Sequence, residues 1–180
     1  LRVLDLCCYV GQWGAQVANL VHASDRTAEV TIVDSSAKAL ALAGENVRLQ
    51  GGSAILEKRD VLETLRDLPP RSYDVVICDP PAFIKKKKDL PTGQAAYAKL
   101  NREALKRLAP GGLFVSCSCS GLLTDDDFRG ALARAAAAND DLDLRFIARG
   151  SHAMDHPQLP MFPQGSYLKC WIGVSTSRSE

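Results

Sequence analysis

The sequence has little excess charge of either sign and no long apolar run. Lysine and arginine number 22 against 21 aspartate and glutamate residues, which leaves a formal net charge of +1. A chain balanced this closely does not bind nucleic acid through overall charge, so any such contact must come from a local patch. No run approaches the roughly 20 apolar residues that cross a bilayer, and no signal segment opens the chain. We therefore expect a cytoplasmic protein without membrane contact.

The sequence also lacks the paired cysteines of a zinc or redox motif, since none of its six cysteines forms a C-x-x-C pair. Five of the six lie in or beside apolar, strand-like runs, which favours reduced, intracellular thiols over a disulfide scaffold. His152 and His156 lie in a proline-rich loop with no third ligand in sight. We expect no metal site.

The 180 residues, 46% of them hydrophobic, are typical of one globular domain. No internal repeat or linker divides the chain, and residues 1–180 are therefore predicted to form a single domain. The sequence opens with Leu1 and enters a strand almost at once. We expect this domain to follow an upstream segment that the sequence does not include.

Short apolar runs alternate with amphipathic segments along the chain, which predicts a parallel sheet covered by helices on both faces. Strands are predicted at Val3–Cys7, Glu29–Val33, Ala54–Glu57, Tyr73–Cys78, Leu113–Cys117, Asp143–Ala148 and Tyr167–Val174. Helices are predicted at Gly14–Val21, Ala37–Leu49, Asp60–Leu65, Gln94–Leu108 and, capped by Thr124, up to Ala138. Pro110-Gly111-Gly112 is predicted to be a turn.

Polar side chains follow successive predicted strands. In open parallel sheets, ligands bind at the carboxyl ends of the strands, so one crevice can gather these side chains. They are Asp5 to Gly11, Asp34, Asp60, Asp79 and the segment Cys117–Ser120.

The first strand is followed by a turn that contains Gly11 and Gly14 but not the full G-x-G-x-x-G fingerprint, which argues against NAD or FAD. The turn alone fits a ligand site or simply a tight connection to a helix. Asp34 lies about 20 residues beyond it, where a carboxylate can accept hydrogen bonds from ribose hydroxyls. Asp60 can accept from an adenine amino group. Each carboxylate can instead cap a helix.

Asp79-Pro80-Pro81 places a carboxylate on a stiff exit from a strand, which suits hydrogen bonding to the edge of a planar base. The next strand ends near Cys117 and Cys119, two thiols two residues apart that should face the same side. An accessible thiol beside this carboxylate can act as a nucleophile. Most free cysteines, however, are small buried hydrophobes.

Taken together, these motifs resemble the class I S-adenosylmethionine-dependent RNA 5-methylcytosine methyltransferases, above all the bacterial enzymes that modify large-subunit ribosomal RNA. The matching segments are residues 4–11, Asp79 to Phe83, Ser118 to Leu122, Asp155-His156-Pro157 and Pro163 to Lys169. The resemblance implies a Rossmann-like methyltransferase fold with a mostly parallel, seven-stranded sheet. It also implies S-adenosylmethionine as cofactor, RNA as partner, and a catalytic domain that lacks its upstream RNA-binding region.

The resemblance assigns roles to individual residues. Asp5, Tyr9 and Gly11 would line the methionine end of the cofactor, Asp34 its ribose and Asp60 its adenine. Cys119 would be the nucleophile, with Cys117 in reserve, and Asp79 would hold the target base through N3 while also facing the cofactor. Ala82 stands where two-cysteine relatives carry a second cysteine, which implies a one-cysteine mechanism.

Other readings stay open at this point. A methyltransferase of the same fold that acts on a guanine or adenine nitrogen needs no thiol, and an RNA-binding domain that kept the fold needs no chemistry. The run Lys85–Lys88 after the Asp79 motif can neutralise RNA phosphates or form a solvated loop. Phe83 can stack on a base or pack in the core. Trp13 and Trp171 are expected to be packing residues.

Overall fold

A computed structural model describes residues 1–63, 65–154 and 156–178. The strands are β1 (Arg2–Leu6), β2 (Glu29–Asp34), β3 (Ser53–Lys58), β4 (Tyr73–Cys78), β5 (Leu108–Ser118), β6 (Leu142–Gly150) and β7 (Lys169–Ser177). The helices are α1 (Gln12–His22), α2 (Ala37–Leu49), α3 (Leu90–Leu105) and α4 (Asp125–Ala137), with short 3-10 turns η1 (Lys87–Asp89) and η2 (Pro163–Gly165).

The strands form one seven-stranded sheet in the order β3-β2-β1-β4-β5-β7-β6. All neighbours are parallel except at β7, which runs antiparallel to both β5 and β6. The direction of the strand order reverses between β1 and β4, where an open α/β sheet has its ligand crevice. This arrangement confirms the predicted Rossmann-like methyltransferase fold with its mostly parallel sheet.

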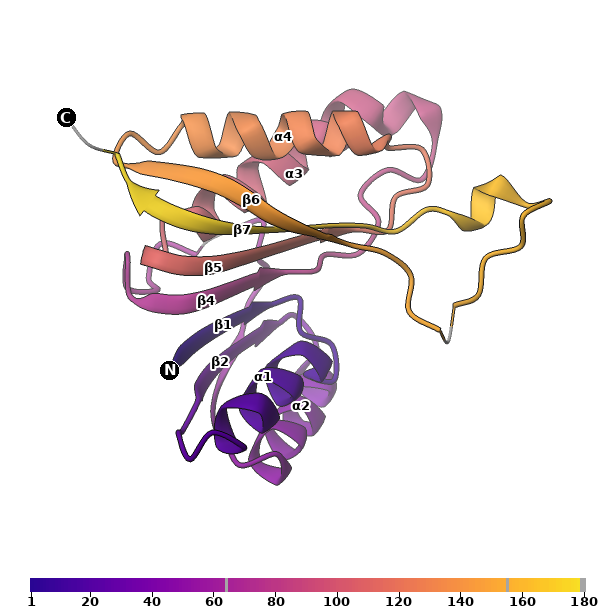
Figure 1. Ribbon diagram of the computed structural model, residues 1–180. Coiled ribbons are helices and arrows are strands. Elements are labelled where there is room, and N and C mark those ends of the chain that lie inside the picture. Colours follow the sequence, from indigo (N-terminus) through magenta and orange to yellow (C-terminus); the bar gives the residue numbers. More distant parts are fainter. Residues whose placement is uncertain (64, 155, 179–180) are drawn as a thin grey trace.

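Helices cover both faces of the sheet, with α1 and α2 on one face and α3 and α4 on the other (Figure 1). Because side chains alternate along a strand, β1 sends Leu4 and Leu6 into the core under α3 and α4, and Val3 into the core under α1 and α2. The first core centres on Tyr97, Phe114 and Phe128, all fully buried. The sheet therefore lies between two apolar cores, one on each face.

The helix boundaries follow local capping chemistry. Helix α4 begins after Thr124, whose hydroxyl accepts a hydrogen bond from the Asp127 amide at 3.1 Å. Helix α2 begins after Ser36 in the same way, and its predicted bounds are confirmed. Helix α3 begins four residues before the predicted Gln94, because Pro91 suits a first helical turn.

Two predicted elements are wrong. Pro110-Gly111-Gly112 is not a turn between elements but lies inside β5, where the register with β4 shifts between Tyr73 and Val75 and Gly111 takes φ +79°. The predicted helix Asp60–Leu65 is absent from the described part of that segment. There Asp60 closes a single turn by accepting the Leu62 amide at 2.8 Å, and residue 64 lies outside the described residues.

The connection between β6 and β7 extends away from the sheet as an arm (Figure 1). It contains η2 and the exposed side chains of Met154, Met161 and Phe162. Asp155, part of a motif noted in the sequence, lies outside the described residues. Among the described helices, none is long and apolar enough to cross a membrane.

Candidate active site

The loop between β1 and α1 has an unusual backbone. Cys7, Tyr9 and Gly11 all have positive φ, at 61°, 48° and 77°. Non-glycine residues seldom adopt this conformation, and such strain persists where the surrounding structure enforces it, often at ligand sites. The loop is held by the Tyr9 amide, which donates to the Asp34 carboxylate at 3.0 Å, and by the Gly11 amide, which donates to the Cys8 carbonyl at 2.7 Å.

Gly11 serves close packing. A Cβ at this position would lie 2.8 Å from the Cβ of Ala43 on α2, nearer than two carbons approach. Gly11 therefore lets α1 start directly against α2, and it lies behind the loop rather than on the cleft that the loop borders.

Asp5 is fully buried beneath the same loop. Its Oδ2 accepts the Gly14 amide at 2.9 Å, while Oδ1 has no hydrogen-bond partner among the described residues. The pKa of Asp5 is raised to about 7, chiefly by burial and also by the nearby carboxylates of Asp79 and Asp34, while the Gly14 hydrogen bond acts to lower it. Asp5 thus supports the floor of the site and does not line the cleft.

The predicted carboxylates Asp34, Asp60 and Asp79 follow β2, β3 and β4 and line one cleft of about 590 Å³. Asp34 also accepts the Ser36 amide at 2.9 Å, which fixes the turn that leads into α2 and still leaves lone pairs for a ligand. The structure therefore brings these three residues together with Tyr9 and Cys119, as the sheet topology predicts. The cleft lining is Cys7, Cys8, Tyr9, Gln12, Trp13, Asp34, Ser35, Arg59, Asp60, Val61, Leu62, Asp79, Pro80, Pro81, Phe83 and Cys119.

Asp79 is oriented by a residue that the sequence analysis assigned to packing. The Trp13 indole Nε1 donates to Asp79 Oδ2 at 2.9 Å, and the Trp13 ring borders the cleft. Burial raises the pKa of Asp79 above its ordinary value, and the Trp13 hydrogen bond partly offsets this rise. The two residues lie 66 positions apart, a separation that carries no recognisable signal in sequence, so only the fold reveals this pair.

Cys119 lies on the cleft just beyond the end of β5, next to the Asp79 turn at the end of β4. Its thiol is half-buried and makes a long contact of 3.9 Å to the Pro80 carbonyl. Burial raises the pKa of the Cys119 thiol and the Asp79 carboxylate raises it further, whereas Lys169 acts in the opposite direction. The Cys119 thiol and the Asp79 carboxylate therefore line the same cleft.

Cys117, the reserve nucleophile, is not suited to that role. It is buried in β5 and paired in register with Cys170 of β7, whose thiol it contacts. This contact and burial raise the pKa of the Cys117 thiol well above its usual range. Because β5 ends at Ser118, strand alternation does not extend to Cys119, and the two thiols do not share the cleft. All six cysteines are free.

Several cleft residues were missed or left open by the sequence analysis. Phe83 borders the cleft and also packs on Tyr97, with ring centroids 4.7 Å apart, so it has both a cleft position and a packing role. Arg59 reaches the cleft from the end of β3 and pairs with Glu57 at 2.6 Å. The run Lys85–Lys88 is exposed just beyond Phe83. No group of three or more metal-ligating side chains occurs in the described ranges.

The site fits S-adenosylmethionine, the cofactor predicted from the sequence. The charged side chains that line it are mainly acidic, which suits a ligand that carries a sulfonium and an ammonium group. Asp34 would accept hydrogen bonds from the ribose hydroxyls. Asp60 would accept from the adenine amino group, as the sequence predicts, and Leu62 adds an apolar side chain to the same cleft.

Comparison with known proteins places the chain in a family. Residues 1–139 match the model of the methyltransferase small domain. The chain is 36% identical over 173 residues to the ribosomal RNA large subunit methyltransferase I of Klebsiella pneumoniae (strain 342), a match that covers 93% of this chain and 42% of that protein. The same named protein of Erwinia tasmaniensis is also 36% identical, with the same shares covered. The chain thus spans well under half of these curated relatives.

Solved structures share the fold. A Streptococcus mutans protein described as an S-adenosylmethionine-dependent methyltransferase superposes with a TM-score of 0.73 at 19% identity, covering 96% of this chain and 44% of the other. A methyltransferase from Corynebacterium glutamicum superposes with a TM-score of 0.60 at 13% identity, covering 98% and 80%. The acidic cleft at the switch point, the sheet order and the match over residues 1–139 lead to one conclusion: this chain belongs to the methyltransferase small domain family.

Proposed function

We propose that this chain is the catalytic domain, over residues 1–180, of an enzyme that methylates carbon 5 of a cytosine in RNA. The methyl donor is S-adenosylmethionine, the cofactor predicted from the sequence and supported by the family match. Ribosomal RNA is the proposed substrate class, because the relatives from Klebsiella and Erwinia are named for large-subunit ribosomal RNA. The observation that carries the proposal is the presence of Cys119 and Asp79 on one wall of the cofactor cleft.

Cys119 would supply the activation that carbon 5 of cytosine needs. The thiol loses its proton, and the sulfur electron pair forms a bond to carbon 6 of the ring. The ring then carries an electron-rich carbon 5, which takes the methyl group that the bound cofactor supplies. A base removes the carbon-5 proton, the electron pair of that bond restores the ring double bond, and the thiolate leaves carbon 6.

Asp79 would bind the pyrimidine edge and stabilise charge on it. Addition at carbon 6 builds negative charge on the ring, and a protonated carboxyl at N3 can neutralise that charge by donating its proton. Burial raises the pKa of Asp79, which favours the protonated form. The Trp13 hydrogen bond fixes one carboxyl oxygen, which would leave the other for the base. A cytosine from a folded RNA must be flipped out to reach this wall.

Product analysis of the Cys119→Ala variant tests the proposal. Transfer of labelled methyl groups to ribosomal RNA, followed by nucleoside separation, should give 5-methylcytosine with the native protein and at least a roughly 100-fold lower yield with the variant. Cys170→Ala is the matched control, a buried thiol away from the cleft, and should keep the activity. Undiminished transfer by Cys119→Ala, with methyl groups on guanine or adenine nitrogen, would replace the proposal with the thiol-independent alternative.

A further inference from the structure

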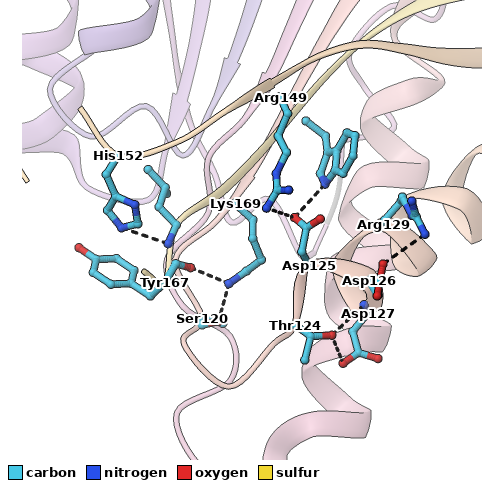
Figure 2. Close-up of polar contacts among 12 residues, drawn as sticks. Ser120, Thr124, Asp125, Asp126, Asp127, Arg129, Arg149, His152, Tyr167 and Lys169 are labelled. Carbon is cyan, nitrogen blue, oxygen red and sulfur yellow. Dashed lines mark hydrogen bonds and ion pairs between the residues drawn. The ribbon is translucent and has the colours of Figure 1, made fainter. Parts of the chain in front are cut away.

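A buried lysine lies behind the proposed nucleophile and has no part in the mechanism above. Lys169 is the first residue of β7 and only 6% exposed. Its ammonium group donates to the carbonyl of Ser120 at 3.1 Å and to that of Tyr167 at 2.5 Å (Figure 2). Burying an ammonium group costs free energy unless it is hydrogen-bonded, and carboxylates usually compensate it. No ion pair joins Lys169 to a carboxylate within the described ranges. A role other than an ion pair is therefore needed to explain why this lysine is buried here.

Ser120 directly follows Cys119, and its hydroxyl, amide and carbonyl groups are all hydrogen-bonded. Its hydroxyl contacts the Tyr97 hydroxyl at 2.9 Å and accepts the Ile84 amide at 3.2 Å. Its amide donates to the Ser118 hydroxyl at 3.3 Å. Lys169 holds the remaining carbonyl, so the turn that carries Cys119 is fixed between α3, β5 and β7.

The charge of Lys169 also acts on Cys119. Three titratable groups face this thiol: Asp79 from the end of β4, Tyr97 from α3 and Lys169 from β7. Asp79 raises the pKa of the thiol, whereas Lys169 lowers it and so favours the thiolate. Lys169 is the cation among these three groups.

Two further charged residues surround Lys169. Asp125 at the start of α4 and Arg149 of β6 also face Lys169, and they pair with each other at 3.2 Å (Figure 2). The Trp171 indole donates to the same Asp125 oxygen at 3.2 Å. The Oδ1 atom of Asp125 thus accepts two donors, whereas the Lys169 ammonium group donates its hydrogen bonds to the carbonyls of Ser120 and Tyr167.

We propose that Lys169 is a positioning residue for the nucleophile: it fixes the turn after Cys119 through the Ser120 carbonyl, and its ammonium group stabilises the Cys119 thiolate. The step it assists is heterolysis of the S–H bond, in which the electron pair stays on sulfur and the proton leaves to water. Lys169 keeps all of its own protons. The proposal deepens the function proposed above, since it rests on Cys119 as the nucleophile.

The pH dependence of Cys119 alkylation tests this role without RNA or cofactor. The native protein and its Lys169→Met variant are treated with iodoacetamide at a series of pH values, and mass spectrometry follows the peptide that contains Cys119. The alkylation rate plotted against pH has a midpoint at the apparent pKa of Cys119. Loss of the nearby cation should raise this midpoint by about one pH unit, which means about tenfold slower alkylation at pH 7. An unchanged midpoint in a folded Lys169→Met variant would overturn the proposal.

Two further variants complete the test. Lys169→Arg keeps the charge and should restore the native midpoint, whereas a shift as large as that of Lys169→Met would contradict the electrostatic role. Lys106→Met removes a partly exposed lysine that pairs with Glu103 at 2.9 Å, and should leave the midpoint unchanged. If Lys169→Met gives no cooperative thermal melt, Lys169→Gln replaces it, with the same upward shift expected and the same unchanged midpoint counting against the proposal.

The alkylation result for Lys169 and the product analysis for cytosine methylation can succeed or fail independently. A shifted midpoint in a protein that forms no 5-methylcytosine would support Lys169 as the residue that tunes this thiol and reject cytosine methylation. Formation of 5-methylcytosine with an unshifted midpoint would reject Lys169 alone.

Discussion

Replacement of Asp5 by asparagine should change how the stability of the protein depends on pH. Burial raises the pKa of this carboxyl from 3.8 to about 7 in the folded protein, whereas an unfolded chain keeps the ordinary value. Between these two values the folded state binds more protons than the unfolded state, so the free energy of unfolding falls as the pH rises. Below pH 3.8 this contribution is fully present, and above pH 7 it is lost.

The size of the effect follows from the shift. Each pH unit between the two pKa values corresponds to about 1.4 kcal/mol, so the Asp5 carboxyl should account for a loss of about 2 to 3 kcal/mol between pH 5 and pH 8. The amide in Asp5→Asn does not titrate, and its oxygen can still accept the Gly14 amide. The variant should therefore gain about 2 to 3 kcal/mol relative to the native protein over this range.

Urea unfolding at 25 °C, at four pH values from 5 to 8, measures this difference directly. Other titrating groups occur in both proteins and cancel in the subtraction. Asp140→Asn, at an exposed position, controls for a general effect of replacing a carboxyl by an amide. A stability difference between native protein and Asp5→Asn that stays constant with pH would show that the buried carboxyl is ionised in the folded state, and would refute the reasoning.

Three further perturbations test other parts of the structure. Trp13→Phe removes the hydrogen bond to Asp79, which raises the pKa of that carboxyl further. Because the protonated carboxyl is the form proposed to act, a pH–rate profile should show its alkaline limb displaced upward and methyl transfer reduced about tenfold. An unchanged profile would show that Trp13 does not tune Asp79. Gly11→Ala places a residue with a side chain in a left-handed conformation and brings its Cβ against Ala43. Urea unfolding should therefore show a free energy of unfolding lower by about 1 to 3 kcal/mol. An unchanged free energy would mean that α1 and α2 can move apart at no cost. Replacing Lys85–Lys88 together by glutamine should reduce the magnitude of the slope of log affinity for RNA against log salt concentration by about 2 to 3. An unaltered slope would mean that these lysines do not contact RNA phosphates.

The fold was predictable because its signals are local. Tyr73–Cys78 is apolar at nearly every position, which marks a strand buried on both faces, and its predicted bounds match the structure. Thr124 with Asp127 marks the start of α4 through capping chemistry. Gly111 misled the prediction, because a glycine with positive φ is equally at home in a turn and in a β-bulge. Only the pairing of β5 with β4 decides between the two.

The site was predictable where residues follow strands, and not where they depend on tertiary contact. Asp34, Asp60 and Asp79 share the cleft because parallel strands end at one edge of the sheet. Cys117 and Cys119 look equivalent in sequence, and it is the end of β5 at Ser118 that separates them. The contacts of Trp13 with Asp79 and of Lys169 with Ser120 join residues 66 and 49 positions apart, and no spacing rule links them.

The covalent route through Cys119 is tested most directly with RNA that contains 5-fluorocytosine at the target position. Fluorine at carbon 5 cannot leave as a proton does, so the bond between sulfur and carbon 6 should persist after methyl transfer. The native protein and Cys117→Ser should both give an RNA-linked band on a denaturing gel, whereas Cys119→Ser should give none. A band that persists in Cys119→Ser and is lost in Cys117→Ser would place the nucleophile on the buried thiol and contradict the account.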